Sequence, residues 1–369
     1  MIKDLLLTVV GFAGLIWGAE WLVRGAAKLA LKAGLSQLVV GLTIVAAGTS
    51  APELAASLRA AWVGSEDLAI GNVVGSNIFN ILGVLGVSAL VRSLSISTQV
   101  LRQEIPIMLG TSVLFIYFLM DLTIQWRESW VLALLMISYF YYLIYQSRSK
   151  SSASNKDIDD SEAELLDEIK LTSRWDSHWS IQLLLVIAGS TILSFGADFL
   201  IKGATGLALK LDINERIVGL TLIAVGTSLP ELTASIIAAA RDHKDIALGN
   251  VIGSNTFNIL GCVGLSGVVS GGDLPITPDI FHVDVWIMLA ASFSLLPLVI
   301  PQLNLSRREG IFFILSYAVY SVFLFLQGVE SSLLPTFQKT LTNYVIPIVI
   351  VALTVRFTEL RFLKKSKGG

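Results

Sequence analysis

Charged side chains are scarce in this 369-residue chain. Asp, Glu, Lys and Arg make up 15% of it and hydrophobic residues 54%, whereas soluble domains carry about 25% charged residues. The charges are clustered, and they leave apolar runs of roughly 20 residues, the length that crosses a bilayer as a helix. The net charge of −2 does not indicate a nucleic-acid partner. We therefore expect an all-α integral membrane protein in contact with a lipid bilayer and with no nucleic acid.

Cysteine and histidine are almost missing. A single cysteine, Cys262, cannot form an internal disulfide. The three histidines, His178, His243 and His282, lie near the ends of apolar runs and lack metal-ligand spacing. A nucleophile–base set is also lacking. We therefore expect neither an enzyme nor a bound cofactor.

Hydropathy predicts ten membrane spans in two sets of five. They lie near residues 5–23, 36–63, 67–91, 104–120 and 129–146, and then near 179–201, 214–240, 245–270, 282–301 and 310–328. A weaker stretch at 342–362 adds an eleventh span if it crosses. We divide the chain into a first five-helix repeat (1–146), a polar cytoplasmic loop (147–177), a second repeat (178–328) and a C-terminal segment (329–369).

The two sets of spans are copies of one unit. Residues 40–88 align with 218–266 at a constant offset of 178, and 30 of the 49 positions are identical. The identities include Gly, Thr, Ser, Pro, Glu and Asn, which chance similarity between apolar segments does not produce. Five spans separate equivalent points, so the second copy is expected to be inverted. Inverted repeats are typical of transporters, with the substrate site at the repeat interface near the midplane.

Lysine and arginine in short loops indicate the orientation. Arg92, Arg148 and Arg307 follow the third, fifth and ninth spans and fall on one side of the membrane. Because that side should be cytoplasmic, we expect the N-terminus outside. Lys202 and Lys210 run against this pattern.

One glutamate lies deep inside an apolar span of each repeat, Glu53 in the first and Glu231 in the second. A carboxylate at this depth costs about 2.5–3.5 kcal/mol on insertion scales and faces the protein interior. Pro52 and Pro230 precede the glutamates, and a proline interrupts a helix. We expect each helix to be kinked there, with backbone carbonyls around Ala46 and Ala224 freed to face a cation.

Oxygen donors surround both glutamates. Threonines stand four residues before them, and a serine and an asparagine four apart follow in the next span. The set is Thr49, Thr227, Ser76, Asn80, Ser254 and Asn258. Hard oxygen ligands without thiolate or imidazole suit Ca²⁺ and Na⁺. Two carboxylates balance one Ca²⁺ or two monovalent ions, whereas an empty, doubly charged site is costly in low dielectric. This charge balance favours obligatory exchange.

The motifs GTSAPE and GTSLPE, each followed by a GNVxGSNxFN segment, resemble the two alpha repeats of the sodium/calcium exchangers. The resemblance implies a cation site that opens alternately to each side. It implies calcium ligands at Glu53, Glu231, Thr49 and Thr227, with Asn80 joining them. The sodium-associated positions that it implies are Ala46, Ser50, Ser76, Ala224, Ser228 and Ser254.

One position departs from part of that family. A potassium-dependent subgroup carries aspartate at the end of the second GSN segment, where this chain has Asn258. We therefore expect a K⁺-independent Ca²⁺/Na⁺ antiporter that works as a monomer in a prokaryotic plasma membrane. A Ca²⁺/H⁺ antiporter on the same scaffold is the alternative, with the glutamates taking protons. A passive channel is less compatible with mid-span carboxylates in inverted repeats.

Overall fold

The computed structural model describes residues 2–153, 178–210, 226–300, 303–351 and 354. Within these ranges, eight helices are long and apolar enough to cross a membrane, or nine if a pair bent by 49° at residues 37–62 counts as one span. The expectation of an all-helical membrane protein is confirmed. The expected span at 214–240 is described only from residue 226, and most of 352–369 lies outside the described residues.

The first half consists of helices joined by short connections. Its elements are α1 (Ile2–Ala33), α2 (Gln37–Val40), η1 (Gly41–Val45), α3 (Ala46–Thr49), α4 (Ala51–Trp62), α5 (Glu66–Phe79), η2 (Asn80–Leu85), α6 (Gly86–Val91), β1 (Leu94–Ser95), η3 (Val100–Glu104), α7 (Ile105–Phe118), η4 (Leu119–Asp121), β2 (Thr123–Ile124) and α8 (Trp126–Ala153). Helix α8 thus continues past residue 146, where the sequence pattern ends the span.

The second half has a matching order. Its described elements are α10 (Trp179–Lys210), α13 (Leu229–Ala240), α14 (Lys244–Phe257), η7 (Asn258–Val263), α15 (Gly264–Ser270), β3 (Leu274–Pro275), η8 (Ile280–Asp284), α16 (Val285–Val299), β4 (Asn304–Leu305), α17 (Arg307–Gly328), α18 (Leu334–Thr340) and η9 (Leu341–Val345). The wide π-turns of η2 and η7 begin at the matched asparagines Asn80 and Asn258.

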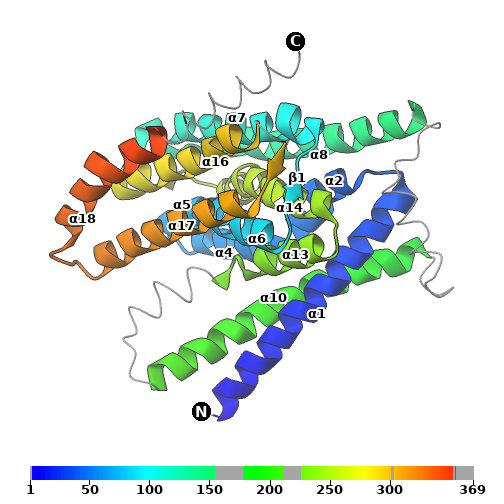
Figure 1. The fold of residues 1–369 in the computed structure, drawn as a ribbon, viewed down its shortest axis with the longest axis horizontal. Coiled ribbons are helices and arrows are strands. Elements are labelled where there is room, and N and C mark those ends of the chain that lie inside the picture. The colour runs from blue at the N-terminus through cyan, green and yellow to red at the C-terminus, as the bar shows by residue number, and fades with distance from the viewer. Residues whose placement is uncertain (1, 154–177, 211–225, 301–302, 352–353, 355–369) are drawn as a thin grey trace.

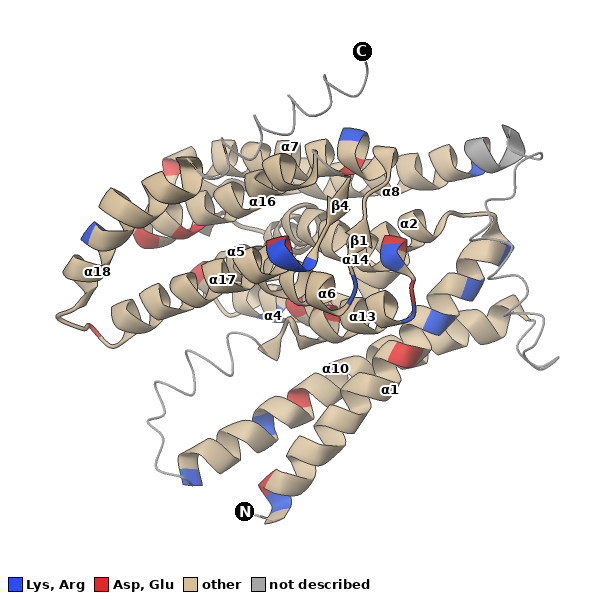
Figure 2. Ribbon diagram, in the orientation of Figure 1, with Lys and Arg blue, Asp and Glu red and all other residues tan. Residues whose placement is uncertain are grey.

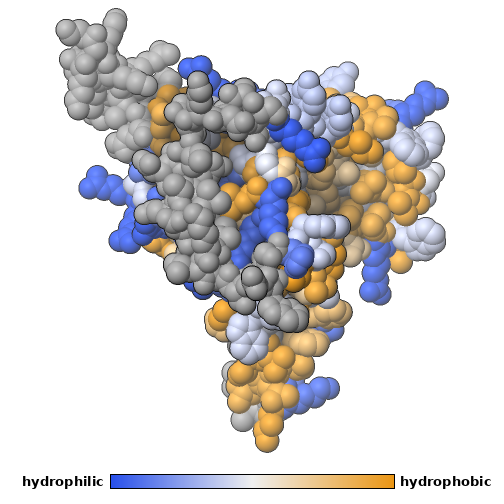
Figure 3. Space-filling model, turned by 90° about the vertical axis from the view of Figure 1, so that its right-hand side faces the viewer, coloured by the Kyte–Doolittle hydropathy of each residue, from blue (hydrophilic) through white to orange (hydrophobic). Residues whose placement is uncertain are grey.

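Two continuous helices form the centre of the bundle. In the most apolar windows of Glu66–Val91 and Lys244–Ser270, 83% and 89% of the residues are buried, against 33% in α1 and 28% in α10. These central helices carry the GSN motifs. Most of the ribbon carries no charged residue, although α1 and α10 carry several along their length (Figure 2). Hydrophobic side chains cover much of the described surface in Figure 3. Such a surface suits contact with lipid.

Helices α1 and α10 lie side by side, crossing the rest of the bundle obliquely (Figure 1). Glycines allow their backbones to touch. A Cβ on Gly18 would lie 2.5 Å from the backbone nitrogen of Leu193, and a Cβ on Gly189 2.5 Å from that of Leu22. Any side chain at these positions would separate the helices.

Connecting segments at one end of the bundle contact one another, and we call them group A. They are residues 33–37, 92–100, 146–147, 241–244 and 303–306. Strand β1 pairs antiparallel with β4, the Ser36 N–H donates to Ser147 Oγ at 2.9 Å, and Gln99 Nε2 donates to Gln146 Oε1 at 3.3 Å. Arg92 forms an ion pair with Asp242 at 3.1 Å.

A second set of connections, group B, consists of residues 65–67, 121–126 and 272–277. Strand β2 pairs antiparallel with β3. The Thr277 N–H donates to Asp67 at 2.6 Å, and the Trp126 N–H donates to Asp273 at 2.7 Å. The central helix Glu66–Val91 runs from group B to group A over 26 residues, roughly 39 Å at 1.5 Å per residue. The two groups therefore lie at opposite ends of the helices.

Candidate cation site

Each glutamate follows a break in its helix. In the first repeat, the helix that begins at Gln37 ends as α3 at Thr49 and restarts as α4 at Ala51, with Ser50 at φ −83° and ψ 9° between them. Ser228, before α13, has nearly the same angles, φ −92° and ψ 10°. A proline stands in the first turn of both restarted helices, where its missing N–H costs nothing. The expected kink is confirmed in the first repeat.

The two breaks exchange side-chain contacts across the repeats. Ser50 Oγ donates to Glu231 Oε1 at 2.8 Å, and Ser228 Oγ donates to Glu53 Oε1 at 3.1 Å. All four side chains are buried, with at most 1% of their surface exposed. Each carboxylate is therefore held by the serine of the other repeat, and the two glutamates share one buried polar centre.

Each carboxylate of this centre has one unused oxygen, because Glu53 Oε2 and Glu231 Oε2 are buried without a hydrogen-bond partner among the described residues. Two other expected ligands on the central helices are in the same state: Ser254 Oγ and both polar atoms of the Asn80 amide. An unpaired buried polar group is costly, and unpaired oxygens of this kind suit a cation. Of the described residues, no three or more His, Cys, Asp or Glu form a metal-binding group. Any ion here would take its other ligands from hydroxyls, amides and backbone.

Two further pairs fix the backbone beneath the glutamates. Asn72 Nδ2 donates to the Glu53 carbonyl at 3.3 Å and to Ser57 Oγ at 3.1 Å. The matched Asn250 Nδ2 donates to the Glu231 carbonyl at 3.4 Å and to Ser235 Oγ at 2.9 Å. Sequence reasoning did not single out Ser57 and Ser235, although their identity at the 178 offset was a usable signal.

Three other expected ligands, Ser76, Thr49 and Thr227, differ in their surroundings. Ser76 Oγ lies 3.1 Å from Ser228 Oγ and so joins the centre; since the one Ser228 hydroxyl hydrogen goes to Glu53, Ser76 is the donor of this second bond. Thr49 Oγ1 is directed to Asn250 Oδ1 at 3.0 Å and to the Ala46 carbonyl at 3.3 Å. Thr227 is half-buried.

The carbonyl of Ala46 differs from the expectation. It accepts the Ser50 N–H at 2.9 Å, so it is not released from hydrogen bonding. The physical reason is that Pro52 removes the donor to Gly48, four residues back, and leaves the donor to Ala46 in place. Ala224 lies outside the described residues.

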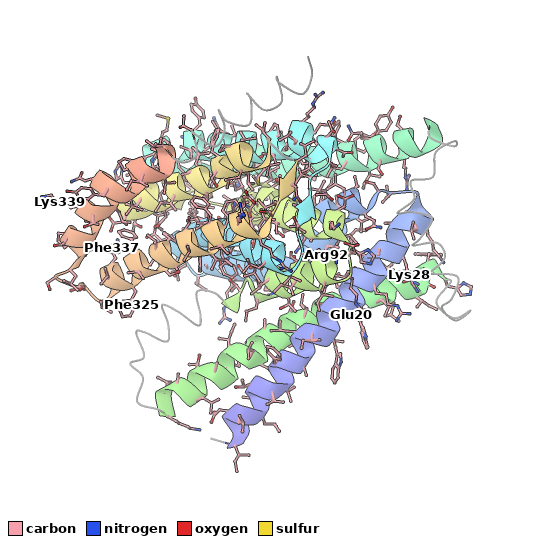
Figure 4. All side chains as sticks on the ribbon, in the orientation of Figure 1. Glu20, Lys28, Arg92, Phe325, Phe337 and Lys339 are labelled. Atoms are coloured by element: carbon pink, nitrogen blue, oxygen red, sulfur yellow. The ribbon has the colours of Figure 1, made fainter. Side chains whose placement is uncertain are left out.

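Two ion pairs among the described residues lie at the edge of the bundle. Arg241, at the end of α13, pairs with Glu20 of α1 at 2.7 Å. Figure 4 labels Glu20 together with Arg92, whose partner Asp242 follows Arg241. Each pair has one member in residues 241–244 of group A, Arg241 in one and Asp242 in the other.

The chain is similar to known proteins along most of its length. The family described as sodium/calcium exchanger protein matches residues 3–147 and 181–326. The putative antiporter CaxA of Alkalimonas amylolytica is 34% identical over 330 residues, covering 88% of this chain and 99% of that protein. The sodium/calcium exchanger MaX1 of Methanosarcina acetivorans is 30% identical, with 87% and 98% covered.

A solved structure is similar as well. The sodium-calcium exchanger NCX_Mj, soaked with 10 mM Na⁺ and zero Ca²⁺, matches with a TM-score of 0.71 and 29% identity, over 86% of this chain and 97% of that one. The family match covers both halves of the chain, and the relatives match nearly end to end. The chain is a multi-pass membrane protein that belongs to the sodium/calcium exchanger family of transporters.

Proposed function

We propose that the protein is a secondary antiporter that exchanges Ca²⁺ for Na⁺ by alternating access and independently of K⁺. The observation that carries the proposal is the reciprocal pairing of Ser50 with Glu231 and of Ser228 with Glu53, which leaves one oxygen of each carboxylate unpartnered among the described residues. Two carboxylates balance one Ca²⁺ or two Na⁺. Leaving both charged and empty is unfavourable in a buried site.

The proposed ligands are the matched oxygen donors of both repeats. They are Glu53, Glu231, Thr49, Thr227, Ser50, Ser228, Asn80, Asn258, Ser76, Ser254 and the backbone at Ala46 and Ala224. Hydroxyl, amide and carboxylate oxygens are the ligands that Ca²⁺ prefers. The sodium/calcium exchanger name of the relative MaX1 is a further support.

The proposed architecture is two inverted five-helix repeats, residues 1–146 and 178–328. Its support is that matched segments fall in opposite groups. Strand β1 belongs to group A and its counterpart β3 to group B, while β2 belongs to group B and β4 to group A. An inverted repeat places equivalent points at opposite membrane faces.

The orientation follows from charge. Group A carries Arg92, Arg241 and Lys244, and Arg307 follows it directly at the start of α17. Basic residues collect on the cytoplasmic side. The N-terminus is then outside, because α1 reaches group A at its C-terminal end. The polar segment 147–177 is cytoplasmic, and 329–369 follows the second repeat. We place the protein, as a functional monomer, in a prokaryotic plasma membrane.

A Ca²⁺/H⁺ antiporter is the second candidate. The observation that favours it is the same unpartnered oxygen on each glutamate, which could carry a proton as well as contact Na⁺. The hydroxyls of Ser50 and Ser228 argue for Na⁺, since a proton needs no additional oxygen ligands.

The experiment that separates the candidates is ⁴⁵Ca²⁺ uptake into proteoliposomes. We expect an outward Na⁺ gradient to drive uptake, with no response to K⁺ in the external medium. Uptake that follows a pH gradient and ignores Na⁺ would establish the proton-coupled alternative. Conductance without any counter-ion would instead indicate a channel.

A further inference from the structure

The matched asparagines Asn80 and Asn258 differ in their contacts although both are fully buried. Asn258 is engaged at both ends of its amide. Its Nδ2 donates to Asn77 Oδ1 at 3.1 Å, and its Oδ1 accepts the thiol of Cys262 at 3.6 Å. The Asn80 amide has no hydrogen-bond partner for its nitrogen or its oxygen among the described residues. The repeat symmetry is therefore broken at this position.

The sequence explains why the Asn80 amide oxygen has no donor like the one that Asn258 has. The residue matched to Cys262 at the 178 offset is Val84, which has no donor. A thiol is a weak donor, but it is correctly placed one helical turn after Asn258. The first repeat cannot form the equivalent bond.

The hydrogen bond of the amide nitrogen is likewise present in the second repeat and missing in the first. Asn255 Oδ1, the counterpart of the Asn77 oxygen that accepts from Asn258, is also buried without a partner. The backbone contacts nevertheless remain symmetric, because Asn77 Nδ2 donates to the Asn255 carbonyl at 3.2 Å and Asn255 Nδ2 to the Asn77 carbonyl at 3.3 Å. The asymmetry is confined to side chains and does not come from a shift of α5 against α14.

We propose that Cys262 is a positioning residue: together with Asn77 it holds the Asn258 amide in a fixed hydrogen-bonded chain, so that, of the matched pair Asn80 and Asn258, only Asn80 supplies an amide oxygen to the transported cation. The proposal rests on the proposed function and narrows its ligand set. An amide oxygen that already accepts a hydrogen bond, on an amide whose nitrogen is also fixed, cannot turn to an ion without breaking both bonds. The Asn80 amide turns without breaking a hydrogen bond to any described residue.

Equilibrium binding of ⁴⁵Ca²⁺ to the purified full-length protein tests the ligand assignment. We expect Asn80→Ala to weaken binding about 10-fold or more, the loss of one ligand worth about 1.4 kcal/mol, and Asn258→Ala to weaken it less than about 3-fold, or about 0.65 kcal/mol. Equal losses in the two variants, or no loss in Asn80→Ala, would overturn the proposal.

A second-site variant tests the role of the thiol. Cys262→Val gives the second repeat the residue of the first and frees the Asn258 oxygen. In the Asn80→Ala background it should restore part of the lost Ca²⁺ affinity. Cys262→Ser keeps a donor and should restore none. Equal affinity of Asn80→Ala/Cys262→Val and Asn80→Ala/Cys262→Ser would contradict a positioning role.

The single cysteine of the chain makes its S–H infrared stretch an isolated signal. We expect the band to lie lower in the wild type than in Asn258→Ala, and to stay in place when Ca²⁺ or Na⁺ is added. A band that rises with either cation would mean that Asn258 turns to the ion, and the proposal would be wrong. The test is distinct from the proposed function, because failed Na⁺-driven uptake does not alter the Asn258-dependent band.

Discussion

At the scale of single residues, Ser50 and Ser228 act differently from ordinary serines at a helix start. A serine in this position commonly accepts a hydrogen bond from the first turn of its helix, a contact worth about 1 kcal/mol. Neither serine makes that contact here. Both hydroxyls instead donate a hydrogen bond to the glutamate of the other repeat. The helix starts therefore lack the stabilising cap, and the two halves are linked at the candidate site.

Replacing either serine should therefore affect ion binding more than folding. Ser50→Ala removes a donor from Glu231, and we expect the apparent affinity for Ca²⁺ to fall about 5- to 30-fold, because hydrogen bonds to charged groups contribute roughly 1.5–3 kcal/mol, part of which a bound ion replaces. The measurement is Na⁺-dependent ⁴⁵Ca²⁺ uptake against Ca²⁺ concentration.

Ser88→Ala is the matched control for that variant. Ser88 is a buried serine of the central helix whose hydroxyl has no partner among the described residues, and we expect unchanged affinity. If Ser50→Ala and Ser88→Ala behave alike, the link between the repeats does not contribute to binding.

The positions of Glu53 and Glu231 could be predicted from the sequence because a carboxylate deep in an apolar span has few explanations and the 178-residue offset pairs them. Their serine partners could not, since which hydroxyl meets which carboxylate depends on how the repeats pack. The difference between Asn80 and Asn258 was also hidden. The residue types are identical, and only the neighbours Val84 and Cys262 distinguish them.

At the scale of elements, breaks and π-turns place the site. The break before α4 could be predicted from Pro52 because the proline removes a backbone donor. The π-turns η2 and η7 could not, because their residues also suit an α-helix. Such insertions are frequent at functional sites. Here they begin at Asn80 and Asn258.

The contact between α1 and α10 yields a prediction at this scale. We expect Gly18→Ala to push the helices apart and to lower stability by about 1–3 kcal/mol, the usual cost of overpacking, because the added Cβ meets the Leu193 backbone. Gly110→Ala in α7 is the control, since a Cβ there meets nothing within 4 Å. Thermal unfolding in detergent compares the two variants, and equal midpoints would mean that close contact is not required.

At the scale of the whole molecule, the connecting segments form two groups at opposite ends of the helices. The sequence predicted which loops share a side from an alternation of spans. Contacts such as Ser36 with Ser147 and Asp67 with Thr277 agree with that alternation.

Orientation can be measured with introduced cysteines. We expect Gly272→Cys, in group B, to react with a membrane-impermeant maleimide in intact cells, and Arg308→Cys, beside group A, to react only after permeabilisation. The native Cys262 is fully buried and should stay silent. The reverse labelling pattern would place the N-terminus in the cytoplasm.

The central claim is that one buried site uses both glutamates, and Na⁺-driven ⁴⁵Ca²⁺ uptake by Glu53→Gln and Glu231→Gln tests it most directly. Each change keeps the shape and removes a charge needed to balance Ca²⁺. We predict that uptake falls about 100-fold or more in either variant, equivalent to roughly 2.7 kcal/mol. Thermal unfolding of both variants in detergent should remain cooperative. The control Glu66→Gln, in the group B connection, should transport normally. Uptake within a few-fold of wild type in either glutamate variant would contradict the account.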